Sequence, residues 1–395
     1  MYPVEKQPSV TAVPSTPTPP YDSSQNLPSH IANSRQPSKW NPRTWNWKTR
    51  LAIAVVTIAI IVSATVGGVL GARANAYPNY SQVTYQLKDT YSGSTFFSNF
   101  DYFTGYDPTH GFVHYVDSEG SKAQNLTTTP STLTSSNTNR TTAVLRVDTS
   151  DKNATTGRRS VRITSKQTYD TGLFIFDVIH SPYGCATWPA LWMVDPNNWP
   201  DYGEIDIMEA VNLANTGNQV TLHTTKGCKI GKSRKRKQTG KAMTYDCWNA
   251  TDGNVGCGVQ GPTNTYGEDF NNMGGGVYAV ELRNEGIRAW MFPRSSIPSD
   301  VPTLGNASTT TQPDPSSWGT PLADFPNLEC DISKHFKNMS IVVNIALCGD
   351  WAGQQGIYSS GGLCPGTCSD FVAQNASSFE KAYWEFGGFW AYGKV

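Results

Sequence analysis

The sequence has no excess of charge of either sign and few charged residues altogether. Lys and Arg number 31, Asp and Glu number 31, and together they make up 16% of the 395 residues. A nucleic-acid partner requires a basic surface, so the composition gives no indication of one. The sequence is instead well supplied with Gly (35), Pro (25), Trp (12) and Tyr (18), which is typical of a β-rich domain with many turns and an aromatic-lined surface.

Cysteine is absent from the first part of the chain, and no two cysteines have the CxxC spacing. The eight that occur are Cys185, Cys228, Cys247, Cys257, Cys330, Cys348, Cys364 and Cys368. Their even number predicts up to four disulfides in an oxidising compartment, with 105 pairings open. A zinc site is the alternative, but Cys364 and Cys368 have no second close pair or His cluster to complete a tetrahedron.

Large apolar residues are scarce before about residue 38, where Pro, Ser, Thr and Gln dominate. Such a segment cannot offset its ordering entropy by burial, so we expect residues 1–50 to form a disordered cytosolic tail. Residues 51–72, LAIAVVTIAIIVSATVGGVLGA, then contain no charge. A helix of that length spans roughly 33 Å, enough for a hydrocarbon core of about 30 Å. The sequence therefore predicts one transmembrane helix.

Basic residues are concentrated before the apolar run, interleaved with Trp40, Trp45 and Trp47 as in a membrane-interface belt. The basic residues are Arg35, Lys39, Arg43, Lys48 and Arg50. The positive-inside rule places this end in the cytosol and the rest outside, as in a single-pass type II membrane protein. A cleaved signal peptide is the alternative, since residues 74–76 (ANA) resemble a cleavage site, but the preceding region and the apolar run are both too long for one.

Glycosylation sequons are absent before the apolar run. The Asn-x-Ser/Thr sites are Asn79, Asn125, Asn139, Asn153, Asn249, Asn306, Asn338 and Asn375. With the cysteines, this distribution predicts that residues 73–395 face the secretory lumen or the cell surface. The C-terminal FGGFWAYGKV has no hydrophobic tail, so a lipid-anchor signal is not expected there.

Beyond a linker over residues 73–80, short alternating runs follow one another without long amphipathic helices between them. The runs are AVLRVD, SVRITSK, GLFIFDVIH, QVTLHTT, GVYAVELR, IRAWMF and SIVVNIAL. Alternation over five to eight residues between turn signals predicts strands. Because the strands do not alternate with helices, we expect residues 80–395 to form an all-β antiparallel sandwich.

Three carboxylates occur within six residues in the segment WPALWMVDPNNWPDYGEIDIME, which ends at Glu209. Glu204 and Asp206 share a face of a strand, whereas Glu209 falls on the other face unless a one-residue bulge occurs at Ile207 or Met208. Like charges on one face push their pKa values apart, giving an acid and a base side by side. An edge strand with solvated acids is the alternative, which the neighbouring tryptophans disfavour.

Several separate motifs resemble glycoside hydrolase family 16, in particular the fungal endo-1,3(4)-β-glucanases. They are DPTHGFVHYVD (107–117), GCATWPALW (184–192), WPDYGEIDIMEAVN (199–212), TLHTTKGC (221–228), GGGVYAVELR (274–283) and CGDWAG (348–353). The resemblance covers about residues 80–395. It implies a β-jelly-roll with an open substrate cleft and a retaining double displacement, with Glu204 as nucleophile, Asp206 assisting and Glu209 as acid/base.

The resemblance also implies contacts with a β-1,3 or mixed β-1,3/1,4-glucan substrate. Trp192, Trp199 and, less directly, Trp351 are expected to stack on sugar rings, while core packing is the alternative for each. His223 matches a histidine beside the reacting sugar, or is a structural histidine; Trp188 is assigned to the core. No cofactor is required and no metal ligands are identified, although a structural calcium is compatible with the sequence. The oligomeric state is left open.

One segment departs from the resemblance. Between Cys228 and Cys247 the chain reads KIGKSRKRKQTGKAMTYD, with four consecutive basic residues, Arg234, Lys235, Arg236 and Lys237. A solvated loop is the simplest interpretation; a contact with anionic wall material or a processing site are the others.

Three functions fit these observations. The first is a membrane-anchored endo-acting hydrolase, the second a cell-wall transglycosylase on the same scaffold, and the third a non-catalytic glucan-binding surface protein. Because a binding protein has no need for both acids, Glu204 and Glu209 favour an enzyme.

Overall fold

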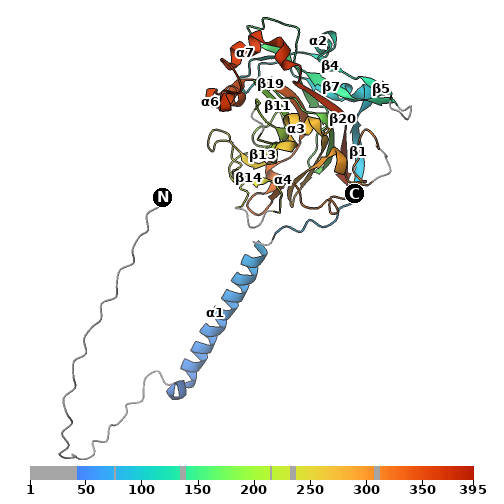
Figure 1. Ribbon diagram of the computed structural model, residues 1–395. Helices are drawn as coiled ribbons and strands as arrows, with labels where there is room; N and C mark the ends of the chain where they lie inside the picture. The colour runs from blue at the N-terminus through green and yellow to red at the C-terminus, as the bar shows by residue number, and fades with distance from the viewer. Residues whose placement is uncertain (1–41, 75–76, 134–138, 214–215, 232–236, 307–311) are drawn as a thin grey trace, which may run out of the picture. The chain divides into compact units, whose positions relative to one another are not determined.

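The computed structural model describes residues 42–74, 77–133, 139–213, 216–231, 237–306 and 312–395 (Figure 1). They fall into two compact units, one ending at Val69 and the other running from Leu70 to Val395, and each is described by itself. The predicted tail falls mostly on residues 1–41, outside the described residues.

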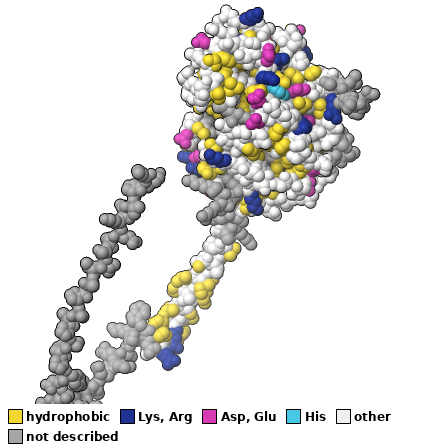
Figure 2. Space-filling model, in the orientation of Figure 1, with side chains coloured by type: hydrophobic (Ala, Val, Ile, Leu, Met, Phe, Trp, Pro, Cys, Tyr) yellow, Lys and Arg dark blue, Asp and Glu magenta, His cyan; other side chains and the backbone are white. Residues whose placement is uncertain are grey.

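The predicted apolar helix is present as α1 (Trp47–Ala74), and it begins at Trp47 rather than Leu51. The side chain of Asn46 accepts a hydrogen bond from the backbone N–H of Thr49 at 2.9 Å, which caps the helix start. The stretch Trp47–Gly71 has a mean hydropathy of 2.5 and is exposed along its length. Figure 2 shows apolar side chains along the face of the helix in view. By length and composition it is a candidate membrane span.

The second unit consists of two large antiparallel sheets, as predicted, with seven of its strands at the seven alternating runs. In spatial order the first sheet contains β18 (Ala323–Pro326), β17 (Gly286–Pro293), β16 (Gly276–Arg283), β10 (Gly172–His180), β20 (Tyr383–Lys394), β7 (Ala143–Arg146) and β4 (Thr127–Thr128), with β1 (Tyr85–Tyr91) also paired to β20. The second sheet contains β14 (Lys241–Ala242), β15 (Cys257–Gln260), β13 (Gln219–His223), β12 (Glu204–Glu209), β11 (Thr187–Val194), β19 (Ser340–Leu347), β9 (Arg162–Ser165) and β2 (Phe100–Tyr102).

The remaining elements are short. Two small sheets pair β3 (Val113–Tyr115) with β8 (Arg158–Ser160) and β5 (Ser131–Leu133) with β6 (Asn139–Thr141). The helices are α2 (Ser118–Ala123), α3 (Gly267–Asn272), α4 (Ile332–His335), α5 (Gly349–Ala352), α6 (Gln355–Tyr358) and α7 (Cys368–Gln374), with 3-10 turns η1 (Pro42–Thr44), η2 (Gly93–Asn99), η3 (Thr263–Thr265), η4 (Arg294–Ser296), η5 (Ser360–Gly362) and η6 (Ala376–Phe379).

The main core lies between the two sheets and contains the inward residues of the second sheet. Leu191, Ile205, Met208 and Val343 are fully buried there, and each such side chain stabilises the fold by about 1.5–3 kcal/mol. A second apolar cluster, around Trp290 and its neighbours, covers the other side of the first sheet. The outer face of the second sheet carries Glu204 and Asp206 instead, because they alternate with the buried residues of β12.

All eight cysteines form disulfides, which confirms the four-bridge prediction and selects one pairing. The pairs are Cys185–Cys364, Cys228–Cys330, Cys247–Cys257 and Cys348–Cys368. Cys185–Cys364 and Cys348–Cys368 hold the segment that follows β19. Cys247–Cys257 closes the connection between β13 and β15, and Cys228–Cys330 joins that connection to the segment that follows β18.

The sequons differ in accessibility. The asparagine is exposed at five of them, Asn79, Asn125, Asn153, Asn306 and Asn375. Asn249 and Asn338 are half-buried, and Nδ2 of Asn338 donates a hydrogen bond of 2.7 Å to the buried carboxylate of Asp195. The atom that would carry a glycan at Asn338 is therefore already engaged. The side-chain environment of Asn139 lies outside what the structure describes.

The basic run is described only at its end, because residues 232–236 lie outside the described residues. The ammonium of Lys237 lies 4.4 Å from the ring centroid of Tyr77, and its backbone N–H donates to Asp324 at 2.8 Å. Lys237, the last residue of the basic run, therefore contacts both Asp324 in β18 and Tyr77 near the start of the second unit.

Candidate active site

Strand β12 carries the three carboxylates and contains the predicted bulge. In its pairing with β11, Asp206 lies opposite Trp192 and Met208 lies opposite Leu191, which leaves Ile207 as the extra residue. Glu209 then lies opposite Ala190. Since Ala190 and Trp192 are two apart on a regular strand, Glu209 shares the outer face with Asp206, and the bulge expected at Ile207 or Met208 is confirmed at Ile207.

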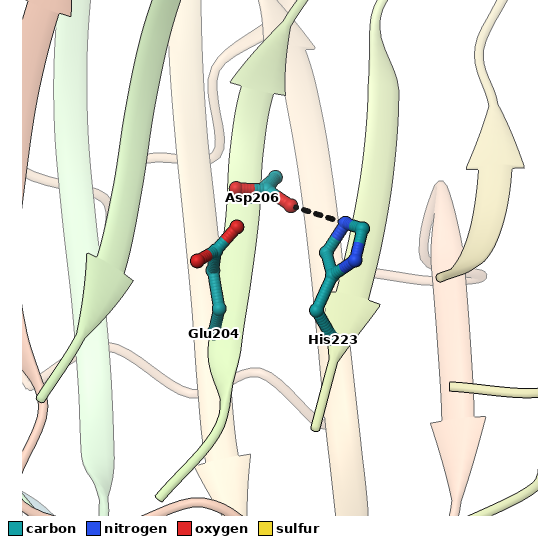
Figure 3. Close-up of side chains that lie close together, drawn as sticks. All are labelled: Glu204, Asp206 and His223. Atoms are coloured by element: carbon teal, nitrogen blue, oxygen red, sulfur yellow. Dashed lines mark ion pairs between the residues drawn. The ribbon is translucent and has the colours of Figure 1, made fainter. Parts of the chain in front are cut away.

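His223 on β13 lies directly across from Glu204 and faces Asp206 (Figure 3). Its Nε2 is 3.3 Å from Oδ2 of Asp206, and its Nδ1 is 3.0 Å from Oδ1 of Asn254. Oδ2 of Asp206 is buried, and its ion pair with His223 is the contact that compensates for this burial. The histidine thus belongs to the carboxylate cluster.

The pKa of His223 is raised to about 9. Burial alone would lower it, but the hydrogen-bonding contact and charge of Asp206, followed by the charges of Glu204 and Glu209, outweigh that effect. At neutral pH the imidazole is consequently a cation that partly neutralises the carboxylates around it.

The pKa values of Glu204 and Glu209 are both raised, in each case by burial first and by the charge of Asp206 second. Both side chains are recessed but partly accessible from the outer face. Glu204 additionally has His223, a hydrogen bond from Trp199 and the charge of Arg162 to favour its ionised form. Trp188 and His223 likewise favour the ionised form of Glu209, but the charge of Glu204 opposes it. The pKa is raised to about 8 at Glu209 and to about 7 at Glu204. This arrangement favours an ionised Glu204 beside a protonated Glu209.

Glu204, Asp206 and His223 each bring one potential ligand atom within 4.8 Å of the others, a geometry that could also hold a metal ion. Carboxylate and imidazole donors of this kind suit several divalent metals. A ligating imidazole nitrogen must first lose its proton. With the pKa of His223 at about 9, a metal ion would compete with a proton at neutral pH.

Trp188 contacts Glu209 directly, which corrects its assignment to the core. Its indole N–H donates a hydrogen bond of 2.7 Å to Oε1 of Glu209, and the side chain is only half-buried. The ring meets that of Trp351 edge to face, with centroids 5.7 Å apart. The sequence did contain a signal for this position: Trp188 is four residues from Trp192, so alternation along β11 places both side chains on the same face.

The other predicted aromatic residues lie toward Glu204. Trp192 is half-buried opposite Asp206, its indole N–H donates to Asn344 at 2.7 Å, and the guanidinium of Arg162 lies 4.9 Å from its ring. Trp199 is 44% exposed, enough to present a free surface. The predicted residues therefore converge on one face of the second sheet, with Trp199 on the Glu204 side and Trp351 on the Glu209 side.

A sandwich whose outer face holds two carboxyls with raised and unequal pKa values beside aromatic rings has the features of a glycoside hydrolase. The comparisons give the family. Residues 100–392 match the model of the XgeA-like catalytic domain of glycoside hydrolase family 16. The chain belongs to glycoside hydrolase family 16.

Three known proteins illustrate the similarity. An endo-1,3(4)-β-glucanase of Arthroderma benhamiae is 39% identical over 320 residues, which are 78% of this chain and 65% of that protein. Laminarinase 16A of Phanerochaete chrysosporium, solved with 6-O-glucosyl-laminaritriose in donor and acceptor sites, is 44% identical with a TM-score of 0.71. An elongating β-1,3-glucosyltransferase of the family is 39% identical with a TM-score of 0.68. In both structural comparisons the match covers 78% of this chain and all of the other chain.

Proposed function

We propose that the protein is an endo-acting β-glucanase that cleaves β-1,3 or mixed β-1,3/1,4-glucan with retention of anomeric configuration. The observation that carries the proposal is the bulge at Ile207, which puts Glu209 on the face that holds Glu204. Retention requires two carboxyls about 5–5.5 Å apart, one to attack and one to protonate. Because the environments of Glu204 and Glu209 differ, Glu204 can serve as the carboxyl that attacks and Glu209 as the one that protonates.

In the first step the carboxylate of Glu204 attacks the anomeric carbon while the carboxyl of Glu209 gives its proton to the departing glycosidic oxygen. The products are a glycosyl ester on Glu204 and a shortened chain with a free hydroxyl. In the second step Glu209, now ionised, takes a proton from water as the water attacks the same carbon, and Glu204 leaves. Asp206, paired with His223, lies between Glu204 and Glu209 on the same face of β12, where its charge opposes loss of the proton from Glu209.

The substrate class is supported by the relatives and by the exposed aromatic surface. The Arthroderma protein is named for β-1,3(4)-glucan, and the Phanerochaete structure holds a β-glucan on both sides of its site. Trp199 and Trp351 lie on opposite sides of the carboxyls in this chain. Indole rings on both sides suit a polymer that crosses the site rather than a chain end.

Glycosyl transfer is the second candidate. The structural relative described as a glucosyltransferase covers the same 78% of the chain as the laminarinase does. The pair Trp188–Trp351 beside Glu209 offers an apolar surface where an acceptor sugar would replace water. Both activities use the same carboxylates, so only the fate of the glycosyl ester separates them.

The test is incubation of the second unit with laminarin, lichenan, chitin and xyloglucan, with a fluorescent laminari-oligosaccharide present as acceptor. We expect new reducing ends from laminarin or lichenan and no products from chitin or xyloglucan. Label transferred into longer chains in excess of reducing-end release would establish the transferase instead. Inactivity on all four polymers would contradict both.

We further propose that α1 anchors the enzyme in a membrane, with residues 1–50 in the cytosol and residues 80–395 at the cell surface or in the secretory lumen. The apolar surface of α1, the basic residues before it and the four disulfides after it support this topology. Sealed microsomes treated with protease provide the measurement. We expect the tail to be digested and the enzyme unit to be protected; protection of the tail would reverse the orientation.

A further inference from the structure

The side chain of Asn218, in the connection between β12 and β13, binds the backbone at the bulge in β12. Asn218 is fully buried just before β13. Its Nδ2 donates a hydrogen bond of 2.8 Å to the carbonyl oxygen of Ile207, and its Oδ1 accepts one of 2.8 Å from the backbone N–H of Glu209. One amide group thus binds the backbone at the bulged residue and at the proposed acid/base.

These two bonds take over where the strand pairing stops. The register of β12 with β13 runs from Glu204 opposite His223 to Asp206 opposite Thr221 and goes no further. Beyond that point a bulged strand has backbone groups without ladder partners. Asn218 provides the required donor and acceptor on one short side chain, a combination that neither Ala nor ionised Asp offers.

Asn218 is itself fixed by neighbouring backbone. The backbone N–H of Asn218 donates a hydrogen bond of 2.8 Å to Oγ1 of Thr265, and its backbone carbonyl oxygen accepts one of 2.8 Å from the N–H of Gly261. Gly217, with φ +93°, lets the chain approach this segment so closely that a Cβ there would lie 2.3 Å from the carbonyl oxygen of Gly261. The backbone that carries the amide is therefore fixed by the fold on both sides.

We propose that Asn218 is a positioning residue for the acid/base carboxyl, an inference that rests on the proposed function. It fixes the backbone of Glu209, while Trp188 holds Oε1 of the same residue. With both ends of Glu209 held, its second oxygen keeps a constant direction toward the glycosidic oxygen. Without Asn218 the bulge relaxes and the proton donor moves, whereas Glu204 at the start of the strand stays in register.

The experiment compares two substrates in Asn218→Ala. Cleavage of a laminari-oligosaccharide needs a proton from Glu209, but departure of dinitrophenolate from a dinitrophenyl β-laminaribioside does not. Since kcat/KM reports the first step only, we expect it to fall at least about tenfold for the oligosaccharide and less than about threefold for the aryl glycoside. The matched control is Asn271→Ala, because Asn271 binds the backbone of Ser181 through both ends of its amide, away from the carboxyls.

A second variant, Asn218→Asp, gives a pH-dependent effect on kcat/KM that a purely structural role of Asn218 would not produce. In Asn218→Asp the protonated carboxyl has the same donor and acceptor pattern as the amide, and ionisation removes the donor. The ratio of its kcat/KM to that of wild type is expected to be highest at low pH and to fall toward the Asn218→Ala level as pH rises. A ratio independent of pH, or equal losses on both substrates, would overturn the inference. Wild-type inactivity on both substrates would instead overturn the proposed function, and this inference with it.

Discussion

Replacement of Glu204 by glutamine is expected to lower kcat/KM on laminarin and lichenan by at least about a hundredfold. Glutamine keeps the shape of the side chain but cannot attack the anomeric carbon. His223 retains its ion pair with Asp206, 3.3 Å away, so the cluster keeps its other contacts. Binding of a laminari-oligosaccharide, measured through tryptophan fluorescence, should change little. Glu119→Gln, an exposed carboxyl in α2, is the matched control.

The smaller variant Glu204→Ala tests the role and not only the importance of this residue. Removal of the side chain opens the face from which Glu204 would attack. Added azide should then attack from that side and give an α-glycosyl azide, with inversion at the anomeric carbon. A β-glycosyl azide would show that Glu204 is the acid/base, and undiminished glucan hydrolysis would remove it from the mechanism.

The second large effect is expected at Glu209. Glu209→Gln should lose at least about a hundredfold in kcat/KM on glucans, because the leaving sugar is no longer protonated. On the dinitrophenyl glycoside kcat/KM should change little, because that leaving group departs as an anion. In Glu209→Ala, azide should attack the ester on Glu204 and give a β-glycosyl azide. Equal losses on both substrates would contradict the assignment of Glu209 as the acid.

The pH profile provides a further check on Glu209. Burial and the charge of Asp206 raise its pKa, so the proton needed for the first step persists to higher pH than on an ordinary carboxyl. The basic limb of kcat/KM on glucans should accordingly lie above the usual carboxyl range. Since only the protonated form is active, activity falls as pH rises through that limb. In Glu209→Gln no proton can be lost at this position, and the limb should disappear.

The strands and the bulge were accessible from the sequence because both follow from local sequence patterns. The short apolar runs at β10, β16 and β19 predicted strands, and the structure has a strand at each, although these central strands are buried on both faces and not only at alternate residues. The odd spacing of Glu209 from Asp206 demanded an extra residue if the acids were to meet, and Ile207 is that residue. Physical constraints on local backbone are readable in this way without knowledge of the fold.

Contacts made across the fold were not accessible in the same way. The hydrogen bond from Trp188 to Glu209 depends on the register of two strands, although its alternation with Trp192 gave a partial signal. Asn218 had no signal, because nothing in TGNQV distinguishes a buried amide from a turn residue. The disulfide pairing was equally hidden, since Cys185 and Cys364 are 179 residues apart.

The bulge also determines which changes in chain length the catalytic face can tolerate. Without Ile207 the strand would read Glu-Ile-Asp-Met-Glu, a strict alternation that still places all three acids on one face. Loss of Ile207, or equally of Met208, therefore retains the constellation, whereas loss of Ile205 would place Glu204 and Asp206 on opposite faces. What the form without Ile207 would give up is the carbonyl that Asn218 binds. Two lengths of the same strand can thus support one chemistry, each with a different means of holding its proton donor.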